Sequence, residues 1–181
     1  IITDASPWGI GGVLVCQDKI LAYFSDAISE DDVAQLGVQI GDCRCQQVVE
    51  ALGVLVALRV WAPTWKDRRV SLRVQTDNVT ALTMVMSLQS KGPVLAKVAR
   101  EMAIDISNSS YEPDAVEHLP GIMNQLADML SRRFEPRGGF ALPSVLSEAT
   151  ECNLPRRSAA WYKCLGAPGP SASHAGNIQD G

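Results

Sequence analysis

Four acidic residues that lie far apart in the chain occupy positions suited to a reactive site. Asp4 ends a short apolar segment typical of a strand, and Asp77 ends a second segment whose apolar residues alternate as in a half-buried strand. Strand ends lie at the rim of a sheet, where functional side chains are exposed. Glu50 shares a helical stripe with small and apolar residues, and Asp128 lies in a later helical segment. Burying an unpaired carboxylate costs several kcal/mol, so we expect cations to meet these side chains.

Each carboxylate also has an ordinary explanation. Asp4 and Asp77 could cap a turn or a helix, and Glu50 could pair with a nearby arginine. Asp128 could form an exposed ion pair with Arg132, four residues further along the same helix. These explanations must all hold separately, whereas one metal site at a sheet rim accounts for the four residues together.

The ligand chemistry of this set favours magnesium. Four carboxylates at one rim would repel one another unless divalent cations were bound, and oxygen ligands favour Mg²⁺ or Mn²⁺ over zinc. Cys43 and Cys45 could form half of a zinc site, but no second cysteine pair lies near them in the sequence. Two metal ions about 4 Å apart stabilise the attacking and leaving oxygens of a phosphoryl displacement. The sequence therefore predicts phosphodiester hydrolysis.

The apolar periodicity predicts an α/β domain that positions these residues, in the order three strands, helix, strand, two helices, strand, helix. The expected strands are 1–4, 10–16, 20–25, 69–77 and 115–119, and the expected helices are 45–61, 78–88, 94–106 and 124–133. Pro63 is expected to end the first helix. The acidic segment 26–42 has no clear period and is expected to be a surface connection.

Composition limits the class of protein. The chain has 181 residues, 46% of them hydrophobic, and a net charge of -4, which fits one globular domain without a general basic character. Its longest apolar run, 51–58, is far shorter than the ~20 residues that span a bilayer, so no membrane partner is expected. The five cysteines lack the spacing of a disulfide framework, which favours an intracellular location, cytoplasmic or nuclear.

Three regions of the chain differ in composition and apolar periodicity. Residues 1–135 carry the periodic segments and the acidic positions and are expected to form the catalytic domain. Residues 136–165 are broken by proline and glycine and are expected to be a loosely docked extension. Residues 166–181 are rich in Gly, Pro, Ser and Ala and are expected to be a disordered tail. Because Ile1 already lies in a strand pattern, the chain is expected to be a piece of a longer polypeptide.

Short motifs surround the acidic residues and continue to the end of the last helix. They are TDAS at 3–6, EAL at 50–52, QTDN at 75–78, HLPG at 118–121 and NQLADMLSR at 124–132. Together they resemble the type 1 ribonuclease H domain of retroelement reverse transcriptases. The last two form the most specific string, which is similar to that of gypsy-like and DIRS-like elements. The resemblance covers residues 1–135 and fills all four acidic positions in order.

The resemblance implies both a fold and a reaction. The fold is RNase H-like, with a mixed five-stranded sheet whose first three strands are antiparallel, flanked by helices, and with the site at the sheet rim. The reaction is endonucleolytic hydrolysis of the RNA strand of an RNA/DNA hybrid, leaving 3'-hydroxyl and 5'-phosphate ends. The cofactors are two Mg²⁺ ions, for which Mn²⁺ can substitute. The implied partners are the hybrid and an upstream polymerase domain in the same polyprotein.

The same resemblance assigns roles to the acidic residues. Asp4 would bridge both metal ions, Glu50 and Asp77 would complete one coordination sphere, and Asp128 would complete the other. His118 matches a mobile histidine that assists proton movement or product release. All five are predicted catalytic residues, and the four carboxylates are the predicted metal ligands.

Small and amide residues near the carboxylates are the candidates for binding substrate. Ser6, Gly9, Gly11, Asn78 and Asn124 are expected to contact strand backbones and 2'-hydroxyls, which distinguish RNA from DNA. Residues 1–135 contain 12 Lys and Arg against 17 Asp and Glu, a net of -5. Phosphate contacts supply most non-specific affinity, so we expect weak hybrid binding unless a joined polymerase domain adds to it.

Two other functions fit the sequence less well. The chain could be a catalytically silent module of the same fold, kept for connection or interaction in a decaying element, and its acidic surface favours that interpretation. It could also be another nuclease of the fold, such as an integrase or a resolvase. The acidic residues of those enzymes have a different spacing, and the string at 118–132 has no counterpart in them.

Overall fold

The structure is a computed structural model and describes residues 1–66, 70–76, 92–109, 111–115 and 122–164. The strands are β1 (Ile2–Ala5), β2 (Gly9–Cys16), β3 (Lys19–Ala27), β4 (Val70–Thr76), β5 (Tyr111–Ala115) and β6 (Thr150–Glu151). The α-helices are α1 (Glu30–Leu36), α2 (Gln46–Trp65), α4 (Pro93–Ser107) and α5 (Ile122–Ser131). Short 3₁₀ turns are η1 (Cys43–Cys45), η2 (Ser144–Leu146) and η3 (Ala159–Trp161).

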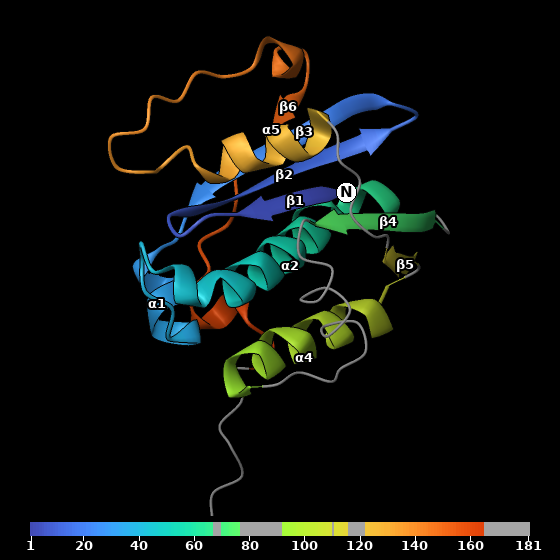
Figure 1. Ribbon diagram of the computed structural model, residues 1–181. Coiled ribbons are helices and arrows are strands. Elements are labelled where there is room, and N and C mark those ends of the chain that lie inside the picture. The colour runs from blue at the N-terminus through green and yellow to red at the C-terminus, as the bar shows by residue number, and fades with distance from the viewer. Residues whose placement is uncertain (67–69, 77–91, 110, 116–121, 165–181) are drawn as a thin grey trace, which may run out of the picture.

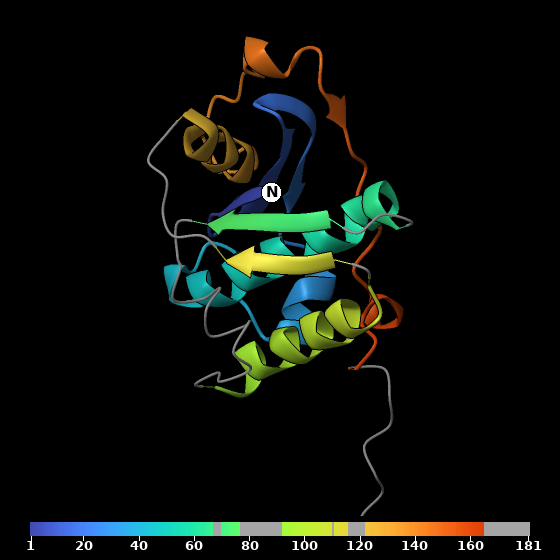
Figure 2. The ribbon, with the colours of Figure 1, turned by 90° about the vertical axis from the view of Figure 1, so that its right-hand side faces the viewer.

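A mixed sheet forms the centre of the molecule, with the strand order β5-β4-β1-β2-β3-β6 (Figure 1). Strand β2 is antiparallel to both β1 and β3, so β1 and β3 run in the same direction and the first three strands are not mutually antiparallel. The pairs β1-β4, β4-β5 and β3-β6 are parallel, and Figure 2 shows β4 and β5 side by side. The predicted α/β class and the five main strands are confirmed, and the two-residue β6 adds an edge strand.

Helices cover both faces of the sheet because the side chains of β2 alternate between two apolar clusters. Ile10 belongs to the cluster built around α2, whereas Val13 packs with Leu126 and Leu130 of α5. Figure 1 shows α5 on one side of β1 and β2 and α2 on the other, with α4 beyond α2. Asp4 of β1 thus lies between two helices that approach from opposite faces.

The segment 26–42 contains helix α1, where the sequence pattern predicted only a surface connection. Ser29 caps the helix and forms a capping box with Asp32, and Gly37 ends it in the left-handed region at φ 65°. Leu36 is 2% exposed. The helix has seven residues, too few for an apolar period to be visible, but its two caps are readable in the sequence.

Several helices and strands begin or end at other residues than the sequence predicted. Helix α2 continues to Trp65 with Pro63 inside its last turn, and burial of Trp65 stabilises that turn despite the hydrogen bond that a proline cannot donate. The last main strand is β5 at 111–115 rather than 115–119. Helices α4 and α5 lie within a few residues of their predicted ranges, whereas the predicted helix 78–88 lies outside the described residues.

The extension 136–165 packs against the domain more closely than a loosely docked segment would, as far as Cys164, its last described residue. Strand β6 pairs with β3, and Leu146 and Tyr162 are buried at 1% and 3% exposure. Arg157, also buried, forms ion pairs with Asp26 and Asp32. The extension is therefore part of the folded unit. Its last predicted residue, 165, and the predicted tail 166–181 lie outside the described residues.

One helix within the described part of the chain, Cys43–Trp65, is long and apolar enough to cross a membrane by length and composition. However, 67% of its most apolar window is buried inside the protein. A central helix of a globular domain has this property, because it packs against a sheet on one side and other helices on the rest of its surface.

Candidate active site

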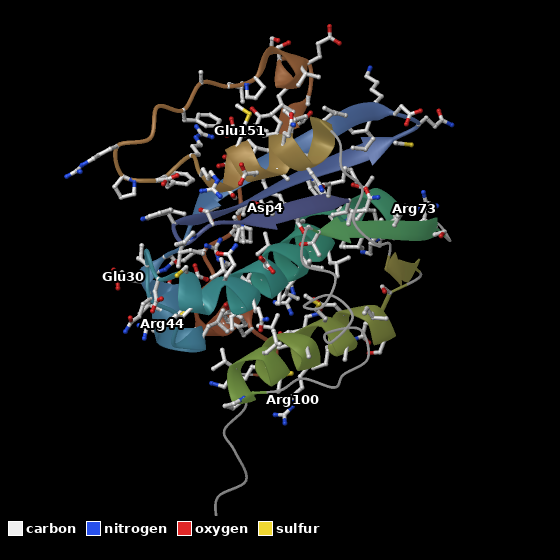
Figure 3. The ribbon with its side chains drawn as sticks, viewed as in Figure 1. Asp4, Glu30, Arg44, Arg73, Arg100 and Glu151 are labelled. Atoms are coloured by element: carbon white, nitrogen blue, oxygen red, sulfur yellow. The ribbon has the colours of Figure 1, made fainter. Side chains whose placement is uncertain are left out.

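Asp4 lies near the end of β1, on the face of the sheet that α5 covers (Figure 3). Its Oδ2 atom is 2.8 Å from the hydroxyl of Ser131, the last residue of α5. The same hydroxyl is 2.9 Å from the carbonyl oxygen of Asp128, so it donates to one acceptor or the other. Ser131 therefore joins the central strand to the helix that carries Asp128.

Ser6 closes the turn that follows β1. Its buried hydroxyl donates to the carbonyl oxygen of Ser131 at 2.7 Å and accepts from the backbone N–H groups of Trp8 and Gly9. This set of bonds fixes the loop next to Asp4 and ties it to the end of α5. The hydroxyl that we predicted to contact substrate thus has a structural role in the turn, and its contact with substrate stays a prediction.

Glu50 approaches the same end of β1 from the opposite face. Glu50 is 7% exposed, and its Oε1 accepts a hydrogen bond from the Gln46 side-chain amide at 3.2 Å. The same amide donates to the carbonyl oxygen of Ala5, the last residue of β1. One turn further along α2, a Cβ at Gly53 would lie 3.8 Å from the carbonyl oxygen of Asp4. Helix α2 is therefore fixed against the end of β1 at the position of Glu50.

Asp128 forms the helical ion pair that its spacing indicated. Its Oδ1 is 2.6 Å from Nε of Arg132, and both side chains are about half exposed. A second carboxylate, that of Glu135, lies 3.7 Å from the same guanidinium. The hydrogen bond to Asp128 raises the pKa of Arg132, and the negative charges of Asp128, Glu135 and Asp4 raise it further.

The remaining predicted site residues divide into two groups. Asn124 is half-buried on α5, one turn before Asp128. Asp77, Asn78 and His118 lie outside the described residues, although β4 ends at Thr76, which pairs with the residue before Asp4. Within the described residues, no three His, Cys, Asp or Glu side chains are grouped so as to hold a metal ion.

Gly9 and Gly11 allow α5 to approach β2 closely. A Cβ at Gly11 would lie 2.5 Å from the carbonyl oxygen of Ala127 and 2.6 Å from the backbone nitrogen of Ser131. A Cβ at Gly9 would lie 2.8 Å from the carbonyl oxygen of Ser131. These two glycines were predicted to contact substrate, and the close approach that the structure shows is to α5. Their contact with substrate stays a prediction.

We expect Gly11→Ala to destabilise the protein by about 1–3 kcal/mol, because backbone atoms of α5 would have to move to accept the methyl group. Gly53→Ala is the matched control. Its Cβ would meet nothing closer than 3.7 Å, and replacing a helical glycine by alanine is favourable by up to about 1 kcal/mol. Urea denaturation of both variants measures the difference, and equal stability would contradict the close packing of α5 on β2.

Three residues of this region were missed by the sequence analysis as parts of the site. Ser131 and Gln46 hold the two acidic side chains, and Arg132, which we considered only as a partner of Asp128, also lies within the field of Asp4. Spacing is the signal that could have found them: Gln46 precedes Glu50 by one helical turn, and Ser131 follows Asp128 by three residues.

Comparison with known proteins adds no family to these observations. No family model, curated protein or solved structure matches the chain.

Proposed function

We propose that this chain is the ribonuclease H of a retroelement, with an RNase H-like fold, and that it hydrolyses the RNA strand of RNA/DNA hybrids. One observation carries the proposal. Asp4, at the end of the central strand, is approached from both sheet faces by helices that carry acidic residues. Helix α5 is joined to it through Ser131, and α2 is joined to the end of the same strand through Gln46.

The described carboxylates fit divalent ions by their chemistry. Asp4, Glu50 and Asp128 supply oxygen ligands, which Mg²⁺ and Mn²⁺ prefer, and Asp77 would complete the set. Glu50 is buried, and its carboxylate is held next to the end of β1 by the hydrogen bond from Gln46. When bound, such ions make water a nucleophile at neutral pH and stabilise the charge on the scissile phosphate.

The chain's own contribution is to hold these carboxylates in place. The Ser131 hydroxyl fixes the orientation of Asp4, and the Gln46 amide fixes that of Glu50. Asn124, which lies on α5 one turn before Asp128, would contact a bound strand, and His118 would assist proton movement or product release. Fixing these groups before substrate binds lowers the entropic part of the barrier.

A catalytically silent module is the second candidate, and one observation favours it. Asp128 is already paired with Arg132, so one predicted ligand has a cationic partner within the chain. The net charge of -5 over residues 1–135 points the same way, because it opposes binding to phosphates. In either case, intracellular location and attachment to a polymerase domain remain part of the proposal.

A cleavage assay tests the proposal. We expect the purified chain with Mg²⁺ or Mn²⁺ to cut the labelled RNA strand of an RNA/DNA hybrid and to leave duplex DNA intact. We expect faster cleavage when the chain is joined to its polymerase domain, since tethering raises the effective concentration of hybrid. Absence of cleavage in both forms, with both metals, would favour the silent module.

A further inference from the structure

Two consecutive arginines follow α5 and have different surroundings. Arg132 pairs with Asp128, a predicted metal ligand, and Arg133 pairs with Glu151 of β6. Each ion pair has a shortest N–O distance of 2.6 Å. Figure 3 shows Glu151 on the extension above α5 and Asp4 on β1 below it. The two arginines thus carry the same charge but pair with acidic residues of different elements, Asp128 of α5 and Glu151 of β6.

We propose that Arg132 is an internal counter-cation of the acidic site, which competes with a divalent ion for the carboxylate of Asp128. This inference rests on the proposed metal-dependent function. It assigns to Arg132 a regulatory effect on metal affinity rather than a part in the reaction, so Arg132 is a positioning residue and not a catalytic one.

The geometry supports the competition. Nε of Arg132 lies 2.6 Å from Oδ1 of Asp128, and the guanidinium also lies 3.7 Å from a carboxylate oxygen of Glu135. An oxygen that accepts a short bond from a guanidinium has part of its charge neutralised and is a poorer metal ligand. A divalent ion that binds this oxygen must displace the guanidinium of Arg132 and is repelled by its positive charge.

The connection to Asp4 extends the effect beyond Asp128. The Ser131 hydroxyl lies within hydrogen-bonding distance of both Asp4 and the backbone of Asp128, so the two acidic residues share one neighbour. The negative charge of Asp4 also acts on Arg132 and contributes to the raised pKa of its guanidinium. Arg132 thus pairs with Asp128 and Glu135, and the charge of Asp4 acts on the same guanidinium.

Mn²⁺ titration in the absence of nucleic acid tests the inference. We expect Arg132→Gln to lower the Kd for Mn²⁺ roughly three- to tenfold, measured by calorimetry on the full chain. Arg133→Gln is the matched control, because it removes the same charge from the neighbouring residue, and its Kd should stay close to that of the unsubstituted chain. Arg132→Lys keeps the charge and should recover most of the original Kd. Circular dichroism verifies that each variant is folded.

A second substitution separates competition at Asp128 from a general effect of charge. In an Asp128→Asn background, Arg132→Gln should no longer tighten Mn²⁺ binding, because the contested carboxylate is gone. An unchanged Kd for Arg132→Gln, or equal gains for the Arg132 and Arg133 variants, would overturn the inference while leaving the proposed function intact. If only the Arg132→Gln variant bound Mn²⁺ measurably, the inference would be supported. If neither the unsubstituted chain nor any variant bound Mn²⁺, both proposals would be overturned.

Discussion

Asp4→Asn should lower the rate of hybrid cleavage by about a hundredfold or more while leaving the fold intact. Partners that only orient metal ligands already contribute about 10- to 100-fold, so a ligand itself should contribute more. The amide has the shape of the carboxylate and can still accept the hydrogen bond from Ser131, so the link between β1 and α5 survives. What is lost is the negative charge that a divalent ion needs. Initial rates with saturating hybrid measure the effect.

Asp18→Asn is the control for this substitution. Asp18 lies in the turn between β2 and β3, with φ 64°, a conformation that asparagine also tolerates well. The Asp18 substitution makes the same chemical change and removes the same charge. Asp18 follows the end of β2 that is far from Asp4, because Asp4 pairs with Gly11 near the start of that strand. The cleavage rate of the Asp18 variant should equal that of the unsubstituted chain. Equal rates for the Asp4 and Asp18 variants would remove Asp4 from the site and with it the proposed metal centre.

Much of the fold could be predicted from the sequence, because strong apolar periods determine which segments become buried. The alternation in β4 and the helical stripe of α4 each indicate one element within a few residues of its bounds. Helix α1 was not predicted, since seven residues are too few to display a period. The extension was misjudged for a different reason. Its proline and glycine residues interrupt any apolar period, and the contact that anchors it joins Arg157 to Asp32, which lies 125 residues earlier in the chain.

In the candidate site, too, local sequence patterns identified residues, whereas contacts between distant segments could not be predicted. Position at strand ends and on a helical stripe was enough to select Asp4 and Glu50. It could not reveal that Ser131 would meet Asp4, because that contact spans 127 residues. The role of Gly11 was equally hidden, since a glycine that admits a ligand and one that admits a helix look alike in sequence.

Arg157 carries the ion pairs that join the extension to the domain. Its guanidinium binds Asp32 through two nitrogens, at 2.8 and 2.7 Å, and also pairs with Asp26. A fourth bond goes to the carbonyl oxygen of Ala27 at 2.8 Å. Arg157 is 3% exposed and Asp32 is fully buried, so each is the main compensation for the burial of the other's charge.

Arg157→Met should destabilise the protein by about 3–5 kcal/mol, because the carboxylate of Asp32 would stay buried without its cation. For a chain of this size such a loss lowers the melting temperature by roughly 10 °C. Arg156→Met is the control, since Arg156 is 81% exposed and its pair with Asp31 should contribute little. Urea denaturation at pH 7 compares the two variants, and a similar midpoint for both would show that the extension adds no stability through this contact.

A second substitution tests the physical reason for the loss. Asp32→Asn in the Arg157→Met background removes the uncompensated charge but keeps an oxygen that can accept the capping bond from the backbone of Ser29. We expect it to recover part of the lost stability, because a neutral amide costs less to bury than a carboxylate. If the double variant were less stable than Arg157→Met, packing of the long arginine side chain, rather than its charge, would hold the extension against α1 and β3.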